Sequence, residues 1–362
     1  MRILYISRKH PPSVGGMEKV SYEIHKRLSK LSDVESVIWG GSNKWLFIIL
    51  PFFVLKSVLI LLTKRIDVIY LADGSISPIM LFVMIFKKPI VVTIHALDIT
   101  YKNGFYQRII PRCVKRADRV ICVSNYTEDE CKKRGISDDR IVVIKNGISD
   151  DFFIENKNIT DLGNELEGKL NISLKNKKII FSTGRLIERK GFHWFTREVV
   201  PEILKKRKDF VYIIAGSGKF ENEIRTAIDK SGLEDVVIMA GRVSDETLKE
   251  LYNSADVFVM PNIRVEGDAE GFGLVALEAA SCGLPVVASD LEGIKDALED
   301  NKTGFLVEPL DKAGYADIIN ELLENGSRKN FNPEISRNTV LKNYDWNIIV
   351  GRYLEEFRKL LS

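Results

Sequence analysis

The sequence predicts an α/β protein made of two doubly wound, Rossmann-like domains. Short apolar runs recur along the whole chain, and stretches with helical periodicity separate them. This alternation is typical of βαβ units in which helices cover both faces of a buried parallel sheet. A chain of 362 residues is too long for one ordinary hydrophobic core and suits two domains of middling size.

The apolar runs fall into two series of about six strands, one series for each expected domain. The first series comprises Ile3–Ile6, Val34–Trp39, Val68–Leu71, Ile90–Ile94, Val120–Val123 and Ile141–Ile144. The second series comprises Lys178–Thr183, Phe210–Ala215, Val236–Ala240, Val257–Met260, Pro285–Ala288 and Gly304–Val307.

The two domains are expected to join at a polar stretch near the middle of the chain. Residues 149–177 are rich in Asn, Lys and Glu and have little periodicity, which is typical of a linker. Near the end, Tyr344–Leu361 carries apolar residues at helical spacing and predicts an amphipathic closing helix. We therefore expect an N-terminal domain over 1–148, completed by the helix at 344–362, and a C-terminal domain over 149–343.

The cysteines and the N-terminal residues predict a cytoplasmic protein. Four cysteines in a chain of this length do not form a disulfide framework, and the spacing of Cys113, Cys122 and Cys131 matches no zinc pattern. We therefore expect a reducing compartment and no metal site. Met1-Arg2 precedes an apolar run that is only strand-sized, so no secretory leader is expected.

The segment Trp45–Leu62 is unusually apolar, with Lys56 as its single charge. Its 18 residues reach the length at which a membrane span is considered. Pro51 interrupts it, however, and it occupies the position of a helix between two strands of one sheet. A buried crossover helix is the first expectation, and a helix that also touches lipid is the second.

Charge is spread unevenly along the chain. Residues 1–150 carry 24 Lys and Arg against 14 Asp and Glu, a net charge of +10, whereas the remainder has a net charge of −7. The asymmetry predicts an anionic partner for the N-terminal half. Gln107–Arg119 interleaves five cations with apolar residues, and Lys132-Lys133-Arg134 adds a second cluster. These clusters fit either an anionic membrane surface or a basic wall that attracts an anionic substrate.

A glycine-rich loop opens a helix after the apolar run Val257–Met260. The loop reads Ala269-Glu270-Gly271-Phe272-Gly273-Leu274, and Glu278 follows about two turns later. Free N–H groups and the helix dipole at such a start favour a phosphate, and glycine lets that phosphate approach the backbone. Glu270 and Glu278 would then lie on either side of the phosphates, within reach of the hydroxyl groups of a sugar and a ribose. Two solvated glutamates on a capped helix are the alternative.

A cationic loop follows the apolar run Lys178–Thr183. It contains Gly184-Arg185-Leu186 and Lys190-Gly191, which are expected at the carboxyl edge of a parallel sheet, where ligands bind in open α/β folds. A diphosphate leaving group gains negative charge as its bond to a sugar breaks. Arg185 and Lys190 can stabilise that charge without a metal. An ordinary surface loop is the alternative.

Two further glycine turns and one histidine follow other strands. Gly15-Gly16 comes after the first apolar run and Gly216-Ser217-Gly218 after Phe210–Ala215, so both turns expose backbone N–H groups. Gly15-Gly16 lacks the dinucleotide pattern G-x-G-x-x-G, which disfavours a dehydrogenase. A tight turn that needs positive φ is the alternative there. His95 follows Ile90–Ile94 and is expected opposite the phosphate site, with a purely structural histidine as the alternative.

Taken together, these residues resemble the family-4 retaining glycosyltransferases, which have the GT-B fold. The likeness covers nearly the whole chain, and the E-x7-E block with the cationic loop is its specific part. In chain order, the matching positions are Gly15-Gly16, His95, Ser124, Asn146-Gly147, Gly184-Arg185-Leu186, Lys190-Gly191, Glu270 and Glu278, and Gly283-Leu284-Pro285-Val286-Val287.

The resemblance implies a retaining transfer of a sugar from a UDP- or GDP-sugar to a hydroxyl group. It implies two Rossmann-like domains facing a central cleft, with the donor mostly on the C-terminal domain and the closing helix crossing back to the N-terminal domain. No D-x-D pair stands at a strand end, so neither a metal nor another cofactor is expected. The residues implied to be catalytic are His95, Glu270, Arg185 and Lys190. Those implied to bind the donor are Gly15, Gly16, Arg185, Lys190, Gly216, Gly218, Val243, Glu270, Gly271, Phe272, Gly273, Leu274 and Glu278.

The expected acceptor is a lipid-linked glycan or a cell-surface polysaccharide precursor. The expected location is the cytoplasm, with peripheral association with the inner face of the membrane left open. Nucleic acid is not an expected partner, because no reader module is visible. A non-catalytic sugar-nucleotide-binding subunit, an epimerase or a phosphorylase with the same fold remain alternatives. The presence of all four implied catalytic residues favours a transferase.

Overall fold

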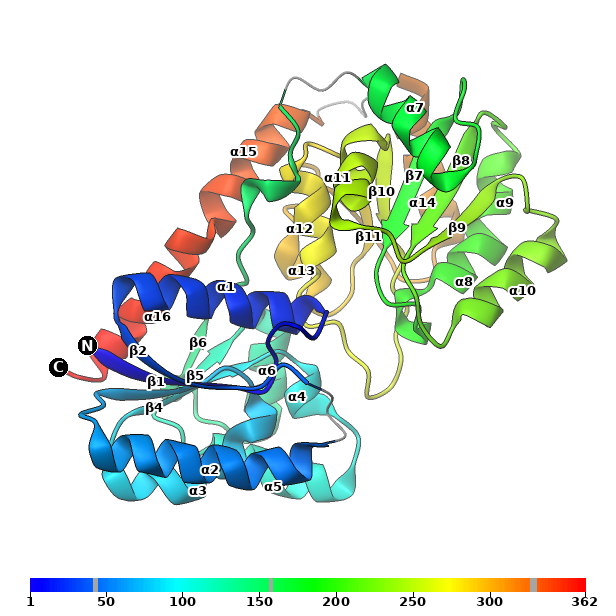
Figure 1. Cartoon of the computed structure of the whole chain (residues 1–362). Coiled ribbons are helices and arrows are strands. Elements are labelled where there is room, and N and C mark those ends of the chain that lie inside the picture. Colours follow the sequence, from blue (N-terminus) through cyan, green and yellow to red (C-terminus); the bar gives the residue numbers. More distant parts are fainter. Residues whose placement is uncertain (42–44, 156–158, 326–330) are drawn as a thin grey trace. The chain divides into compact units, whose positions relative to one another are not determined.

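The computed structural model describes residues 1–41, 45–155, 159–325 and 331–362 (Figure 1). Its strands form two six-stranded sheets, and the chain divides into two compact units. The first unit comprises Met1–Gly147, Gly267–Phe272 and Tyr344–Ser362, and the second comprises Ile148–Glu266 and Gly273–Asn343. The domain expected over 149–343 differs from this division at two places, because Ile148 belongs to the second unit and Gly267–Phe272 groups with the first.

The sheet of the first unit has the strand order β2-β1-β3-β4-β5-β6, with parallel pairing throughout. Both faces of β3 and β4 are fully buried, which explains why apolar runs marked these strands so clearly. Every strand begins and ends within one residue of its predicted run. The strands are β1 (Arg2–Ser7), β2 (Asp33–Ile38), β3 (Val68–Leu71), β4 (Ile90–Ile94), β5 (Arg119–Cys122) and β6 (Ile141–Val143).

The sheet of the second unit has the order β12-β11-β10-β7-β8-β9 and is also parallel. From β7 the chain adds strands outward on one side and then, from β10, on the other, which is the doubly wound arrangement that the sequence predicts. The strands are β7 (Lys178–Thr183), β8 (Phe210–Ala215), β9 (Val237–Gly241), β10 (Val257–Met260), β11 (Val286–Ser289) and β12 (Phe305–Val307).

Helices cover both faces of the first sheet (Figure 1). α1 (Gly16–Leu31) and α16 (Trp346–Lys359) lie together on one face. The other face is covered by α2 (Leu46–Thr63), α3 (Met80–Val83) and α5 (Gly104–Val114), and the 3₁₀ turns η2 (Gly74–Ile79) and η3 (Met84–Phe86) flank α3. Two shorter helices, α4 (Leu97–Thr100) and α6 (Asn125–Lys133), follow β4 and β5.

The helices of the second unit pack around its sheet and its hydrophobic core. A π-helical turn at Phe195–Val199 joins the first two helices after β7. The helices are α7 (Ile159–Leu170), α8 (Phe192–Trp194), α9 (Val200–Leu204), α10 (Glu221–Ser231), α11 (Asp245–Ser254), α12 (Leu274–Ser281), α13 (Ile294–Ala297), α14 (Lys312–Asn325) and α15 (Pro333–Tyr344).

The apolar segment predicted as a buried crossover helix is α2, and only one of its faces is buried. Ile49, Phe53 and Ile60 pack into the core of the first unit. Leu55 and Leu59, on another side of the same helix, are exposed. Over the described residues, no helix is long and apolar enough to cross a membrane.

The polar stretch predicted as a linker contains the helix α7. Leu166 of α7 is fully buried, and the Lys169 ammonium lies 2.6 Å from the buried Glu250 carboxylate of α11. The stretch predicted as a linker therefore includes a helix, α7, that packs within the second unit, which the prediction did not specify. Its apolar residues are few, and its packing against α11 is a long-range contact that composition does not show.

The C-terminal helix predicted over Tyr344–Leu361 is α16, and it packs into the first unit. It starts later than predicted, because Tyr344 ends α15 and the Asp345 side chain caps α16. Trp346 at its start is fully buried against Gly147, where an added Cβ would lie 2.5 Å from the indole ring. Farther along α16, the Phe357 ring lies 5.4 Å from the Tyr70 ring between centroids.

Candidate active site

The topology of the second sheet brings two of the predicted motifs to one place. β7 and β10 are neighbours, and the chain leaves their carboxyl ends in opposite directions along the sheet. Such a switch point leaves a crevice at the carboxyl edge, where ligands bind in doubly wound folds. The loop after β7 carries Arg185 and Lys190, and the loop after β10 leads to α12 and Glu278.

The loops after β7 and β8 run against each other, and glycine makes this packing possible. The Gly184 N–H donates to the Ala215 carbonyl over 3.0 Å, and the Leu186 N–H donates to the Ser217 carbonyl over 3.0 Å. A Cβ on Gly216 would overlap the Gly184 carbonyl oxygen, and one on Gly218 would overlap that of Leu186. The packing of the two loops therefore requires glycine at 216 and 218, independently of any contact that Gly216 and Gly218 make with a ligand.

Lys190 is held rigidly, whereas Arg185 is exposed. Lys190 ends a 3₁₀ turn and is 7% exposed, and its side chain would touch a Cβ on Gly184 at 3.5 Å. The next residue, Gly191, has φ 67° and lies so close to Pro261 that a Cβ would overlap the Pro261 carbonyl. This close approach fixes the end of the cationic loop against the start of the β10 loop, so the ammonium is preorganised.

Glu278 is buried in α12 and accepts a hydrogen bond from a tyrosine. Its Oε2 lies 2.9 Å from the hydroxyl of Tyr252 on α11, and both side chains are buried. Burial and the neighbouring carboxylate raise the pKa of Tyr252 well above its ordinary value, so the phenol stays protonated and donates. The alternative of a solvated glutamate is therefore wrong for Glu278. Gly273, at φ 93°, begins α12, and no side chain caps the helix start.

His95 lies at the carboxyl end of β4 in the first unit, and two hydrogen bonds fix it. Its Nε2 donates to the Ala72 carbonyl over 2.9 Å, and its backbone N–H donates to Asp98 Oδ1 over 2.8 Å. Asp98 Oδ2 also accepts from the Gly74 N–H. Burial raises the pKa of Asp98, although the His95 ring and both N–H groups act in the opposite direction.

The backbone beside His95 is strained. Ala96 has φ 78° and ψ −71°, values close to the rare classic γ-turn. Backbone strain of this kind costs on the order of 1–3 kcal/mol and tends to persist at functional sites. A Cβ on Gly271 would overlap the His95 carbonyl oxygen, so this turn and the loop that carries Glu270 lie in direct contact within the first unit.

The predicted site residues therefore form two groups. In the first unit, His95 lies beside the segment that contains Glu270, Gly271 and Phe272, and the Glu270 side chain is half-buried. The centroid of the Phe272 ring lies 6.1 Å from that of the Tyr344 ring. In the second unit, the group comprises Arg185, Lys190, Gly216, Gly218, Gly273, Leu274 and Glu278. Val243 follows β9, and no described contact joins it to this group.

Gly15 and Gly16 begin α1 at the carboxyl end of β1. Gly15 has φ 161°, which is extended, so the alternative of a turn that needs positive φ is wrong at this position. Nearby, the Lys9 ammonium lies 2.8 Å from the buried Glu18 carboxylate. The glycine turn is thus bordered by a tightly held ion pair.

Sequence reasoning missed the residues that support the site. Tyr252 holds Glu278 from a helix 26 positions earlier, and no local pattern signals that contact. Asp98 stands three residues after His95, a spacing typical of a side chain that caps a backbone N–H, and this signal was available. The ion pair between half-buried Arg8 and buried Asp73, 3.1 Å apart, joins the ends of β1 and β3, the switch point of the first sheet.

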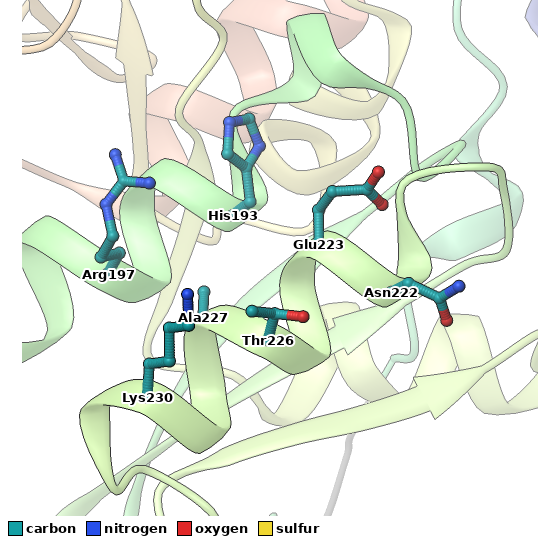
Figure 2. Close-up of a pocket in the computed structure, with 7 residues that line it drawn as sticks. All are labelled: His193, Arg197, Asn222, Glu223, Thr226, Ala227 and Lys230. Atoms are coloured by element: carbon teal, nitrogen blue, oxygen red, sulfur yellow. The ribbon is translucent and has the colours of Figure 1, made fainter.

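A pocket of about 400 Å³ lies elsewhere in the second unit, between the α8 region and α10 (Figure 2). His193 and Arg197 line it from one side and Glu223, Thr226 and Lys230 from α10. Burial lowers the pKa of His193, and Arg197 lowers it further. No predicted site residue lines this pocket. Among the described residues, no group of three or more His, Cys, Asp or Glu side chains is arranged to hold a metal ion.

Comparison with known proteins gives the family. The model described as "Glycosyltransferase Family 4" matches residues 14–152, and the model described as "Glycosyl transferases group 1" matches residues 164–338. The chain is 29% identical over 285 residues to the uncharacterized glycosyltransferase MJ1607 of Methanocaldococcus jannaschii. The aligned region covers 75% of this chain and 70% of the relative.

A second relative is the amylovoran biosynthesis glycosyltransferase AmsK of Erwinia amylovora, 35% identical over 170 residues, or 46% of this chain and 41% of the relative. Among solved structures, HepE of Anabaena in complex with UDP superposes with a TM-score of 0.78 at 21% identity, over 99% of this chain and 100% of that chain. The two matched models, taken in order along the chain, and the shared fold show that this protein belongs to the family-4 glycosyltransferases and has the GT-B fold.

Proposed function

We propose that this glycosyltransferase moves a sugar from a UDP- or GDP-sugar to a hydroxyl group, with retention of anomeric configuration and without a metal. The observation that carries the proposal is the switch point of the second sheet. There, the buried and preorganised Lys190 and the glycine-started helix α12 border the same carboxyl edge. An ammonium and a helix N-terminus at one edge favour a diphosphate.

In this proposal the diphosphate lies along the loop after β7. Lys190 and Arg185 neutralise the charge that develops on it as the bond to the sugar breaks. Glu278, held by Tyr252, accepts hydrogen bonds from the ribose of the donor. HepE, which shares the fold, binds UDP, and this supports a nucleotide donor.

Retention requires no side-chain nucleophile if the leaving phosphate removes the proton of the incoming hydroxyl on the same face of the sugar. His95 and Glu270 then orient the transferred sugar. The strained Ala96 turn, which places the His95 carbonyl against Gly271, supports this role. Such a carbonyl can stabilise positive charge on the sugar ring.

We propose a lipid-linked glycan or a cell-surface polysaccharide precursor as the acceptor, used in the cytoplasm at the inner face of the membrane. The relative AmsK is named for the biosynthesis of amylovoran, which supports this acceptor class. The net charge of +10 over residues 1–150 supports an anionic surface as the place of action.

A panel of UDP-, GDP- and ADP-sugars tests the donor. A donor at 100 times its Kd should stabilise the protein by about 2.7 kcal/mol in thermal unfolding. The bound donor is then tested for turnover, and the anomeric configuration of the product is measured by NMR. Binding without turnover on any acceptor would favour a non-catalytic subunit, and an inverted product would contradict the retaining mechanism.

We expect activity to survive treatment with EDTA, because Arg185 and Lys190 supply the positive charge that a divalent ion supplies in metal-dependent transferases. The rate is measured before and after chelation, with inductively coupled plasma analysis of the protein as a control for residual metal. Loss of activity that Mn²⁺ or Mg²⁺ restores would show that the cations alone are insufficient.

The two glutamates are expected to act at different stages. Glu278→Gln should raise the KM for the donor roughly 10- to 100-fold with a smaller effect on kcat, because ribose contacts exist in both ground and transition states. Glu270→Gln should mainly lower kcat, because its sugar contact is made at the reacting ring. Steady-state kinetics check both, and Tyr252→Phe should reproduce part of the Glu278 effect. The reverse pattern would exchange the two roles.

A further inference from the structure

The first unit carries a broad apolar face that nothing in the described chain covers. Phe52, Leu55, Leu59 and Leu62 of α2 are between 56% and 70% exposed. Their spacing of three or four residues places them on one side of the helix. The side chains that anchor α2, such as Ile49 and Phe53, point instead into the core.

The apolar face continues beyond α2. Leu81, Phe82, Ile85 and Phe105 are between 50% and 79% exposed. They belong to α3, η3 and the first turn of α5, and Figure 1 shows α2, α3 and α5 on the same side of the first sheet. A contiguous exposed apolar surface of this kind is typical of an interaction site rather than of a free surface.

Three arginines border this face. Arg108, Arg112 and Arg116 follow one another at four-residue spacing along α5 and just past its end, and all three are exposed. With Leu81, Phe105 and Ile109 they line a pocket of about 450 Å³. In the part of the chain that the structure describes, no acidic side chain forms an ion pair with these arginines. From Gly74 to Ala117 the sequence holds one carboxylate, the buried Asp98.

Four of the other basic residues that the sequence singled out are engaged in ion pairs, and Lys115, beside Arg116 in the chain, is exposed. Arg119 lies 3.1 Å from the Glu356 carboxylate of α16. In α6 and just past its end, Lys132 pairs with Glu128, and Lys133 and Arg134 both pair with Glu130. The unneutralised positive charge of this region is therefore concentrated beside the apolar face.

We propose that this apolar face with its arginine-lined pocket is a membrane-docking surface for an anionic leaflet. Its apolar side chains enter the boundary between headgroups and acyl chains, and the three guanidinium groups bind lipid phosphates. A second copy of the chain fits less well, because a symmetric contact would bring the arginines of both copies together without carboxylates between them. The role of this surface rests on the proposed function, since docking would bring the first unit to a lipid-linked acceptor.

Co-sedimentation of the full chain with vesicles tests the proposal without any turnover. Vesicles of phosphatidylcholine alone are compared with vesicles that also contain phosphatidylglycerol, at low and at high salt. We expect binding to the anionic vesicles that weakens as salt screens the arginines. The triple variant Arg108→Ser, Arg112→Ser, Arg116→Ser should bind them more weakly by about fivefold for each arginine, or on the order of 100-fold.

Two further variants separate the surface from net charge and from folding. The triple variant Lys132→Ser, Lys133→Ser, Arg134→Ser removes the same charge from the ion-paired cluster and should bind nearly as the unchanged chain does. The double variant Leu55→Ser, Leu59→Ser should lose binding even at low salt while unfolding at the same temperature, because both side chains are exposed.

Equal loss in the two cationic variants would overturn the proposal, because net charge would then explain the binding. So would equal binding to neutral and anionic vesicles. A chain that is dimeric by light scattering and becomes monomeric on Leu55→Ser, Leu59→Ser would show a protein interface instead. Donor binding is measured in every variant. Docking without turnover would contradict the proposed function alone, and turnover on a soluble acceptor without docking would contradict this inference alone.

Discussion

Replacing Lys190 with alanine is expected to lower kcat by about 100-fold or more, in line with the loss of one preorganised electrostatic stabiliser. Lys190 is 7% exposed and fixed between the Gly184 backbone and the Gly191–Pro261 contact, so no water or mobile cation replaces it at low cost. Arg185→Ala should have a comparable effect on kcat. Steady-state rates with the preferred donor measure both.

The controls separate charge from packing. Lys190→Met keeps most of the buried side-chain volume and should lose activity as Lys190→Ala does, whereas Lys190→Arg should retain part of it. Lys312→Ala removes a half-exposed lysine that pairs with glutamates on the same unit and should leave the rate unchanged. Rates near normal in both Lys190→Ala and Arg185→Ala would contradict the diphosphate site.

Trp346→Ala is expected to reduce the free energy of unfolding of the first unit by about 3–5 kcal/mol, the range for removal of a buried large aromatic side chain. Trp346 is 1% exposed and fills the space next to Gly147 at the start of α16. Urea unfolding followed by circular dichroism measures the loss. The second unit, which lacks this contact, should keep its own transition.

Trp45 offers a matched control, because it is a tryptophan of the same unit that is 56% exposed. Trp45→Ala should change the stability by no more than about 0.5 kcal/mol. If Trp346→Ala left the first transition in place, α16 would contribute little to the unit with which it packs.

The central strands were predictable because both of their faces are buried. A strand such as Val68–Leu71 must then be apolar at every position, and the run itself marks its ends. The same reasoning failed for α2. Ile49 and Leu55 are equally apolar, yet one packs into the core and the other is exposed. A helix that is apolar all round carries no periodicity that identifies its buried side.

The candidate site was predictable where it depends on short loops between a strand and a helix. Lys190 and Glu278 lie at the switch point that the strand order requires. The grouping of Gly271 with His95 was not predictable, because a loop that leaves the second sheet supplies it to the first unit. Tyr252 was missed for a similar reason, since its bond to Glu278 joins two helices that are separate in sequence.

The packing of α16 has a consequence for biosynthesis. A nascent chain leaves the ribosome from its N-terminus, so β1–β6 are complete before the residues of the second unit are made. The aromatic surface around Tyr70 and the space beside Gly147 then stay open to solvent until Trp346 and Phe357, which follow the second unit in the sequence, have emerged. The first unit therefore begins to form before the second unit is made and is completed only after it. Until then, the first unit presents an apolar surface of the kind that chaperones bind.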